Sequence, residues 1–555
     1  MTNSFQTKPG NTTNQVETSR LYNLLLTLAI GVNFSGLFLD IIGPDGTLYA
    51  SIAKTMVLKN NYIEMFGNGT DWLDKPHFPF WITAISFKIF GINNWSYKLP
   101  AILFLLAGAA YTWKFAMRLY HDRTIAKWSV MLLLSAEHII LSNTDVRAEP
   151  YLTALVIASL YYFQKAYSDK KTIPLILGSL FAALAIMTKG LIAIIPVGAA
   201  MVGQLIMTGN RKEIFHPRWL IAGILILVFI TPELYALYYQ FDLHPEKIVF
   251  GKTGVSGLKF FFWDSQFGRF LNTGPIRGNG DPIFFLHTIL WAFLPWSLVL
   301  YVALYSRIKN AITKQPAVEW YTISAALLTF LVFSLSRFQL PHYLNIIFPF
   351  FAIITANYIR SLEQTRVLRM VQYAIILILM AGVAGLHVFF KPGVQNIPVL
   401  LLMAAVLILM IFLPRLFHAS EKEIIIGRSV LAMVLVNFYV NGFFYPRLLT
   451  YQGGTTAARY INAHYAGYPV LQLKSRYNYP LEFYLDTELQ TIPAVSDTGT
   501  FKKPYILILH SDDDSLHRIP LQSFALFPIS KINIKFLDPA KRKDQLKLFN
   551  IYLMQ

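Results

Sequence analysis

Long apolar stretches recur along most of the chain and are separated by short polar turns. A helix that crosses a membrane needs about 20 mainly apolar residues. Thirteen candidate spans lie near residues 22–42, 97–117, 124–143, 147–166, 172–188, 190–208, 218–239, 282–304, 318–335, 342–362, 368–390, 397–416 and 427–446. The pattern predicts an α-helical polytopic membrane protein with about 13 transmembrane helices.

Four segments do not follow this pattern. Residues 1–21 are polar and predict a cytoplasmic N-terminal tail. Residues 43–96 form a long loop in which 48–58 and 80–90 have apolar residues at helical spacing, as interfacial helices do. Residues 240–281 form a second polar, glycine-rich loop. The two loops and the transmembrane helices together make one predicted domain, residues 22–450.

The last segment, residues 451–555, reads as a small soluble α/β domain. Strand-like runs at 469–473, 504–510 and 532–537 alternate with more helical runs at 456–464 and 538–549. This alternation is typical of strands and helices that pack on one another. We therefore expect an external C-terminal α/β domain.

Composition supports a membrane protein and excludes several kinds of site. Of 555 residues, 55% are hydrophobic and 14% charged, and the mean hydropathy is +0.46. Soluble domains are about 25% charged. The chain has no cysteine, which excludes disulfides, thiolate metal sites and a cysteine nucleophile.

The positions of the cations decide how the net charge of +18 is interpreted. With the N-terminus inside, the inner segments carry twenty Lys and Arg residues and the short outer turns carry four, namely Arg147, Lys189, Arg337 and Lys391. Cytoplasmic loops are enriched in Lys and Arg in this way. The charge therefore reflects membrane topology, so no nucleic-acid partner is predicted, and residues 451–555 are expected outside.

Charged residues near helix ends on the outer side are the candidates for chemistry, because charges there are costly unless paired, solvated or functional. Four cations could hold a phosphate or diphosphate group: Lys75, Lys189, Arg269 and Arg337. Asp45 and Asp145 could serve as a base and a positioning group for a group transfer. Asp74, His342 and Tyr343 lie in the same segments. Simpler interpretations remain open: the lysines could extend to the membrane surface, and Arg147 could pair with Asp145 or Glu149.

Taken together and in order, these segments resemble the integral-membrane GT-C glycosyltransferases of the protein-mannosyltransferase and aminoarabinose-transferase type. The resemblance covers roughly residues 20–350 and rests on PDGTLYASIAKTM from residue 44, WLDKPHFPFW from 72, DVRAEP from 145, MTKG from 187, FFFWDSQFGRF from 260 and SRFQLPHYLNIIFP from 336. It implies a GT-C fold, Asp45 as the catalytic aspartate and Lys75 on the lipid phosphate.

The resemblance also implies the reaction. The donor would be a polyprenyl-phosphate sugar that enters from the outer leaflet, and the sugar would pass with inversion to a lipid, glycan or protein acceptor. The chain departs from the family at Gly46, where a second acid is common, and at Gln266, where the family has His. The latter argues against the metal suggested for that family, although Asp74 and His77 keep some ligand capacity. No cofactor is predicted.

Other functions are compatible with the same features. A transporter or flippase of a lipid-linked sugar would also use cations and carboxylates, but it predicts charges near the midplane and broken helices. A lipid-linked glycan ligase would use a large loop with Arg and His and would not need Asp45. A non-enzymatic scaffold leaves Asp45, Lys75 and Asp145 unexplained. Short loops and the absence of cysteine favour a bacterial inner membrane.

Overall fold

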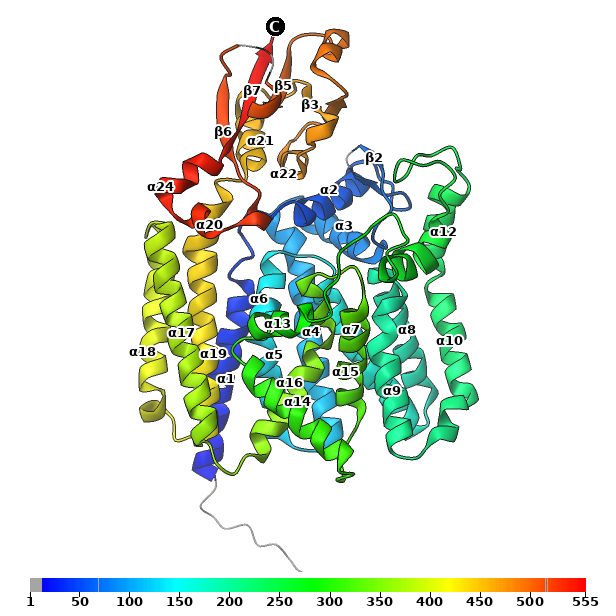
Figure 1. Cartoon of the computed structure of the whole chain (residues 1–555), viewed down its shortest axis with the longest axis vertical. Helices are drawn as coiled ribbons and strands as arrows, with labels where there is room; N and C mark the ends of the chain where they lie inside the picture. Colours follow the sequence, from blue (N-terminus) through cyan, green and yellow to red (C-terminus); the bar gives the residue numbers. More distant parts are fainter. Residues whose placement is uncertain (1–11, 68, 515, 517) are drawn as a thin grey trace, which may run out of the picture.

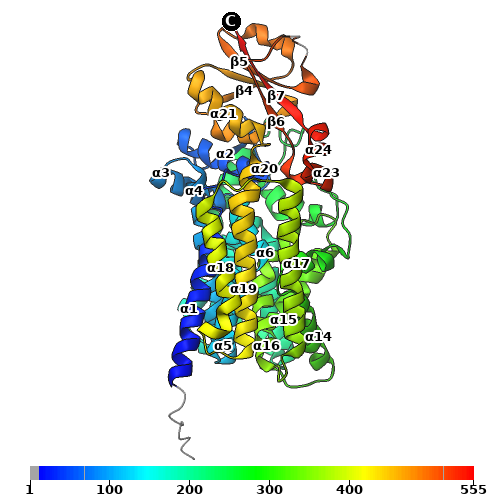
Figure 2. The ribbon, with the colours of Figure 1, turned by 90° about the vertical axis from the view of Figure 1, so that its left-hand side faces the viewer.

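The computed structural model describes residues 12–67, 69–514, 516 and 518–555. Long helices lie side by side in a bundle, and an α/β unit formed by residues 451–555 lies at one end of it (Figures 1 and 2). Helix α1 (Thr12–Phe34) begins at the opposite end of the bundle (Figure 1). Part of the expected tail, residues 1–11, lies outside the described residues, and its other residues from Thr12 onward already form α1.

Each predicted span contains helix in the described part of the chain. The bundle helices are α1, α4 (Asn94–Tyr120), α5 (Arg123–Leu134), α6 (Glu137–Thr144), α7 (Glu149–Asp169), α8 (Thr172–Lys189), α9 (Ile195–Met207), α10 (Pro217–Phe229), α11 (Thr231–Leu237), α13 (Phe284–Ala292), α14 (Ser297–Ile312), α15 (Tyr321–Leu335), α16 (Phe348–Ser361), α17 (Arg366–Phe390), α18 (Ile397–Leu416), α19 (Glu421–Tyr439) and α20 (Tyr445–Leu449).

Six helices among the described residues are long and apolar enough to cross a membrane, or up to eight if each bent pair counts as one span. This supports a membrane-embedded helical protein, and the count of thirteen spans stays a prediction. The most apolar windows of α17 and α18 are 11% buried, whereas that of the segment from α19 to α20 is 78% buried. Helices α17 and α18 therefore lie at the periphery, where their apolar side chains can face lipid.

Two of the predicted spans are broken. Helices α5 and α6 meet at an angle of 50°, and α10 and α11 at 44°. Broken helices are expected of a transporter, and this chain has them. Their presence therefore does not separate a transporter from an enzyme. The predicted first span also ends early, because α1 stops at Phe34 and residues 35–44 form turns that lead to the next helix.

Helix ends are fixed by capping side chains. Asn93 and Ser96 form a capping box at the start of α4, and Ser420 and Glu423 form another at α19. The Asp122 side chain accepts hydrogen bonds from the first turn of α5. Such caps satisfy backbone N–H groups that a helix leaves without partners.

Residues 43–96, the first predicted outer loop, contain both of the amphipathic helices predicted for them. Helix α2 (Asp45–Leu58) and helix α3 (Phe78–Phe90) are joined through a short hairpin of β1 (Phe66–Gly67) and β2 (Thr70–Asp71). The loop at 240–281 begins within a π-helical turn, η3 (Tyr238–Asp242), and contains α12 (Gly257–Lys259) and a second π-helical segment, η4 (Phe260–Gly268). In Figure 1, α2 and α3 lie between the bundle and the C-terminal unit.

The C-terminal unit contains a five-stranded mixed sheet in the order β4-β3-β5-β7-β6. Its strands are β3 (Val470–Leu473), β4 (Leu489–Ile492), β5 (Tyr505–His510), β6 (Gln522–Leu526) and β7 (Lys547–Met554). The parallel neighbours are β3 with β4 and β5, and β7 is antiparallel to β5 and β6. Helices α21 (Gly453–His464) and α22 (Tyr479–Tyr484) accompany the sheet.

The predicted strands at 469–473 and 504–510 are present as β3 and β5, but the predicted strand at 532–537 is wrong. The Asn533 side chain there accepts a hydrogen bond from the Phe536 N–H and caps the short helix α23 (Ile534–Leu537). Of the expected helical run at 538–549, helix α24 (Pro539–Arg542) and the 3-10 turn η11 (Lys543–Gln545) occupy the first part, and β7 begins at Lys547.

Candidate active site

A cavity of about 180 Å³ lies where the two predicted outer loops meet the ends of the bundle helices. Segments far apart in the sequence contribute to its wall. The lining residues are Asp45, Leu48, Tyr49, Asp74, Lys75, Arg147, Ala148, Glu149, Lys189, Arg269, Ile276, Phe338, Leu340, His342 and Tyr343. Four cations, two lysines and two arginines, line the cavity together with three carboxylates. A fourth carboxylate, that of Asp145, lies behind Arg147. The charged groups are therefore close to balanced.

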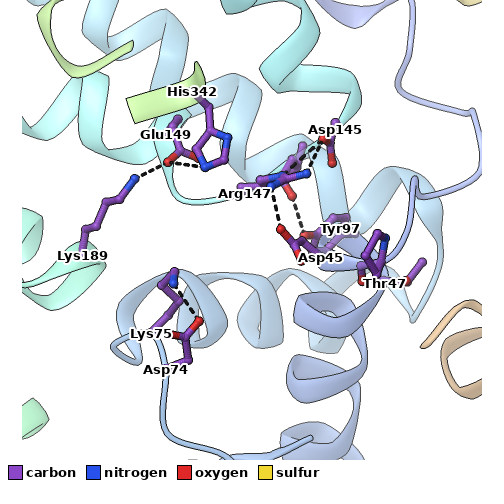
Figure 3. A network of polar contacts seen from close by, with 12 residues as sticks. Asp45, Thr47, Asp74, Lys75, Tyr97, Asp145, Arg147, Glu149, Lys189 and His342 are labelled. Carbon is purple, nitrogen blue, oxygen red and sulfur yellow. Dashed lines mark hydrogen bonds and ion pairs between the residues drawn. The ribbon is translucent and has the colours of Figure 1, made fainter. Parts of the chain in front are cut away.

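Arg147 joins the two predicted catalytic carboxylates. Its Nη1 donates to Asp45 Oδ2 over 2.6 Å, and its Nη2 and Nε donate to Asp145 Oδ2 over 3.0 and 3.2 Å (Figure 3). Asp45 begins helix α2, whereas Asp145 ends helix α6. Tyr97 Oη donates to Val146 O over 2.9 Å and so holds the turn between Asp145 and Arg147. The predicted pairing of Arg147 with Asp145 is confirmed.

The two aspartates differ in exposure. The side chain of Asp45 is 41% exposed, and that of Asp145 is 23% exposed. Burial raises the pKa of Asp145, and the neighbouring Arg147 only partly offsets this effect. Asp45 is thus the more accessible of the two carboxylates, and Asp145 lies behind Arg147.

Glu149 organises a second group of charges at the start of α7. Its Oε1 accepts a hydrogen bond from Lys189 Nζ and lies 3.7 Å from His342 Nε2 (Figure 3). Lys189 Nζ also lies 3.9 Å from the ring centroid of Tyr343. The Glu149 side chain is 4% exposed, so these contacts provide the compensation that a buried carboxylate requires.

Asp74 anchors a third group in the first outer loop. Its Oδ2 accepts from Lys75 Nζ over 2.7 Å, and its Oδ1 accepts from Arg269 Nη2. Burial by itself raises the pKa of Asp74, but Lys75 and Arg269 outweigh this effect and lower the pKa to about 2. Asp74 therefore stays ionised at neutral pH and holds both cations at the cavity wall.

The residues considered as metal ligands have other partners. His77 is fully buried, and its ring nitrogens contact Glu233 Oε1 at 3.1 Å and Ile63 O at 2.9 Å. Gln266 Oε1 accepts from Ile192 N, and the Gln266 amide packs so closely on Gly190 that a Cβ there would meet it at 2.1 Å. Among the described residues, no group of three or more His, Asp or Glu side chains could hold a metal ion.

Arg337 is the predicted site residue that the structure places elsewhere. Its side chain is exposed, and its neighbours Ser336 and Phe338, not Arg337 itself, line the cavities. The Arg337 backbone packs against Gly278 and Gly280 of the second outer loop. The other predicted binding residues, including His342 and Tyr343, come together.

An apolar cavity of about 60 Å³ adjoins the charged one. The two share Glu149, Lys189, Arg269, Phe338 and Tyr343. The remaining wall is mainly apolar and includes Leu152, Ile192, Ala193, Phe270, Phe333 and Ile346. A polar cavity beside an apolar one suits an amphiphilic ligand.

Comparisons with known proteins bear on the fold and on sequence similarity. The family model for dolichyl-phosphate-mannose-protein mannosyltransferases matches residues 74–235. A solved structure of ArnT from Cupriavidus metallidurans, bound to undecaprenyl phosphate, superposes with a TM-score of 0.73 at 18% identity, over 95% of this chain and 97% of that one. The fold is a GT-C fold.

Sequence relatives point the same way. An uncharacterised protein of Aquifex aeolicus is 24% identical over 517 residues, which cover 91% of this chain and 93% of that protein. An undecaprenyl phosphate-alpha-4-amino-4-deoxy-L-arabinose arabinosyl transferase of Proteus mirabilis is 27% identical over 307 residues, or 54% of this chain. That match spans about half of the relative, 52% of its length. The predicted resemblance to GT-C glycosyltransferases of the aminoarabinose-transferase type is confirmed.

Within this GT-C fold, Phe338 is a cavity residue that the sequence did not indicate, and Glu149 was considered only as a possible partner of Arg147. Glu149 follows Asp145 by four residues in the same outer turn, which was a usable signal, but its partner Lys189 is 40 residues further along the chain. The Arg269 guanidinium carbon lies 5.7 Å from the ring centroid of Phe338. No motif in the sequence marks that contact.

Proposed function

We propose that this protein is an inverting glycosyltransferase that moves a sugar from a polyprenyl-phosphate donor to a lipid, glycan or protein acceptor on the outer face of the membrane. One observation carries the proposal. An accessible carboxylate, Asp45, shares a cavity with Lys75, Lys189 and Arg269, and that cavity adjoins an apolar one with which it shares wall residues. These are the features required for a base, a phosphate and a lipid chain.

The donor would lie across both cavities. Its phosphate would contact Lys75, Lys189 and Arg269, which are held at the wall by Asp74 and Glu149. The first part of the lipid chain would enter the apolar cavity beside Phe270 and Ile346. Charged hydrogen bonds to phosphate are among the strong ones. The similar structure of ArnT was solved with undecaprenyl phosphate, which supports this donor class.

The reaction follows from this placement. The Asp45 carboxylate accepts the proton of an acceptor hydroxyl, whose oxygen forms a bond to the anomeric carbon from the side opposite to the phosphate. The bond from that carbon to the phosphate oxygen breaks, and the electron pair leaves with the polyprenyl phosphate. Cations at the phosphate stabilise the developing negative charge. Arg147, held by Asp145, fixes the Asp45 carboxylate in direction.

Comparing envelope lipids, glycans and glycoproteins by mass spectrometry tests this function. Cells that carry the wild-type chain should contain a glycosyl increment that is absent in cells without it and in cells with Asp45→Asn. The polyprenyl-phosphate sugar should accumulate in the latter two. If the increment persists with Asp45→Asn but is lost without the gene, the ligase alternative is favoured. If the donor accumulates on the inner leaflet alone, a flippase is favoured.

The proposed orientation has the N-terminus in the cytoplasm and residues 451–555 outside the inner membrane. It is supported by the cation distribution and by the start of α1 at the end of the bundle opposite to the C-terminal unit (Figure 1). Reporter fusions at the two ends should be active on opposite sides of the membrane. Activity of both on one side contradicts an odd number of spans.

A further inference from the structure

The turn segment that leads to Asp45, residues 35–44, is held by side chains from distant parts of the chain. On the bundle side, the fully buried Lys98 donates from Nζ to Gly36 O and Leu39 O, both over 2.9 Å. These contacts secure the beginning of the segment. The residues directly before Asp45 have different partners.

Those partners belong to the C-terminal unit. The Gln452 side chain holds two points of the backbone, because its Oε1 accepts from Gly43 N over 2.9 Å and its Nε2 donates to Ile41 O over 3.0 Å. Tyr484 Oη accepts from Ile41 N over 2.8 Å and donates to Asn94 Oδ1 over 2.6 Å. The Gln452 side-chain amide thereby forms the donor and acceptor hydrogen bonds that a neighbouring backbone would form with the segment.

Two further contacts extend this attachment. Arg459 of α21 forms an ion pair with Asp40, five residues before Asp45. From α2 itself, Lys54 Nζ donates to Phe483 O over 2.8 Å and to Leu485 O at the end of α22. Orphan carbonyls at a helix C-terminus are favourable partners for a lysine. Both the segment before Asp45 and the helix that Asp45 begins are therefore fixed to the C-terminal unit.

We propose that Gln452 and Tyr484 are positioning residues for the Asp45 carboxylate, so that the C-terminal unit takes part in catalysis without touching substrate. This inference rests on the proposed role of Asp45. Gly43 is two residues from Asp45 and is held directly by Gln452, whereas Arg147 contacts the Asp45 carboxylate itself. A displacement of about 1 Å from the productive geometry can lower a rate about 100-fold.

The test uses the full-length protein with two variants and a matched control. Tyr484→Phe removes the hydroxyl that holds Ile41 N, and Gln452→Met removes both contacts to the segment at similar size. Tyr505→Phe is the control, because Tyr505 is buried in the same unit and its hydroxyl contacts Thr498 O, away from the segment. The readouts are turnover, donor KM, binding of undecaprenyl phosphate and amide hydrogen exchange across residues 40–46.

We expect both variants to lower kcat by about 10- to 100-fold, with donor KM and undecaprenyl phosphate binding close to wild type. Exchange at residues 40–46 should become faster, while peptides around Lys189 stay unchanged. The control should change none of these. Because the variants act through Asp45, combining them with Asp45→Asn should give little further loss in turnover.

A folded Tyr484→Phe protein with wild-type kcat would overturn the inference, even if Gln452→Met fails to fold. The inference is also overturned if the two variants lower turnover by the same factor in the wild-type and Asp45→Asn backgrounds. It is likewise overturned if the control Tyr505→Phe lowers turnover by the same factor as they do. If Asp45→Asn itself retains turnover, the proposed function of Asp45 fails; if Asp45→Asn is inactive and the two variants are unaffected, the positioning inference alone fails.

Discussion

Replacing Asp45 by Asn should separate catalysis from stability. The change keeps the shape of the side chain and removes its charge. Arg147 loses the contact to Asp45 at 2.6 Å but keeps two contacts to Asp145, at 3.0 and 3.2 Å. Because Asp45 is 41% exposed, its ion pair contributes about 0–1 kcal/mol to stability. The variant should therefore insert and fold.

Turnover should respond far more strongly. Loss of a general base typically lowers a rate about 10²- to 10⁴-fold, which corresponds to roughly 3–5 kcal/mol in the activation barrier. Such a loss cannot follow from the small change in stability. Binding of undecaprenyl phosphate should stay near the wild-type value, because its proposed partners are Lys75, Lys189 and Arg269.

Asp145→Asn is the informative comparison. It neutralises a carboxylate whose pKa is raised by burial, so the lost contacts to Arg147 and the removal of a buried charge have opposite effects on stability. We expect a small change in thermal stability and a smaller loss of turnover than in Asp45→Asn. The assay is sugar transfer with purified protein, alongside thermal unfolding. Near-wild-type turnover of Asp45→Asn would refute the reasoning, and collapse with Asp145→Asn alone would assign the base to Asp145.

Three other predictions concern the same cavity. Lys75→Met, Lys189→Met or Arg269→Met should each weaken undecaprenyl phosphate binding about 10- to 100-fold in a titration, whereas Lys88→Met, an exposed lysine of α3, should not. Because the pKa of Asp145 is raised above 3.8, acidification protonates Asp145 at a higher pH than an ordinary aspartate and releases Arg147. The kcat/KM value should therefore begin to fall at a higher pH than an ordinary aspartate would give, and the pH of this fall should shift in Asp145→Asn. Chelation should leave transfer unchanged, and activity restored by a divalent ion would contradict this.

Much of the site could be predicted from the sequence, because charges at the outer ends of apolar helices are unusual and local in sequence. Asp45, Lys75 and Lys189 stand out for this reason. Pairing was harder to predict, since the Lys189 partner Glu149 and the Arg269 partner Asp74 are set by helix packing across 40 and 195 residues. Arg337 has the same local signal, yet its backbone geometry places it outside the cavity.

The fold shows the same division. Hydropathy located the helices, but it could not show that α5–α6 and α10–α11 bend, because a bend depends on neighbours. In the C-terminal unit, the alternation at 532–537 favoured a strand, whereas Asn533 caps a helix there. Strand β7 was missed because its first residues continue a polar, lysine-rich run that favours a helix. The contacts of Gln452 with residues 41 and 43 have no sequence signal at all.

The attachment of residues 40–43 to the C-terminal unit has a consequence for biogenesis. Asp45 emerges from the ribosome early, near the first helix, whereas Gln452 and Tyr484 are made about 400 residues later. Domains generally form in the order of synthesis, so the bundle would be inserted before the segment at Asp45 acquires its last partners. A nascent or truncated chain could hold the charged cavity and still lack an ordered carboxylate, which would delay reaction with membrane lipids until translation is complete.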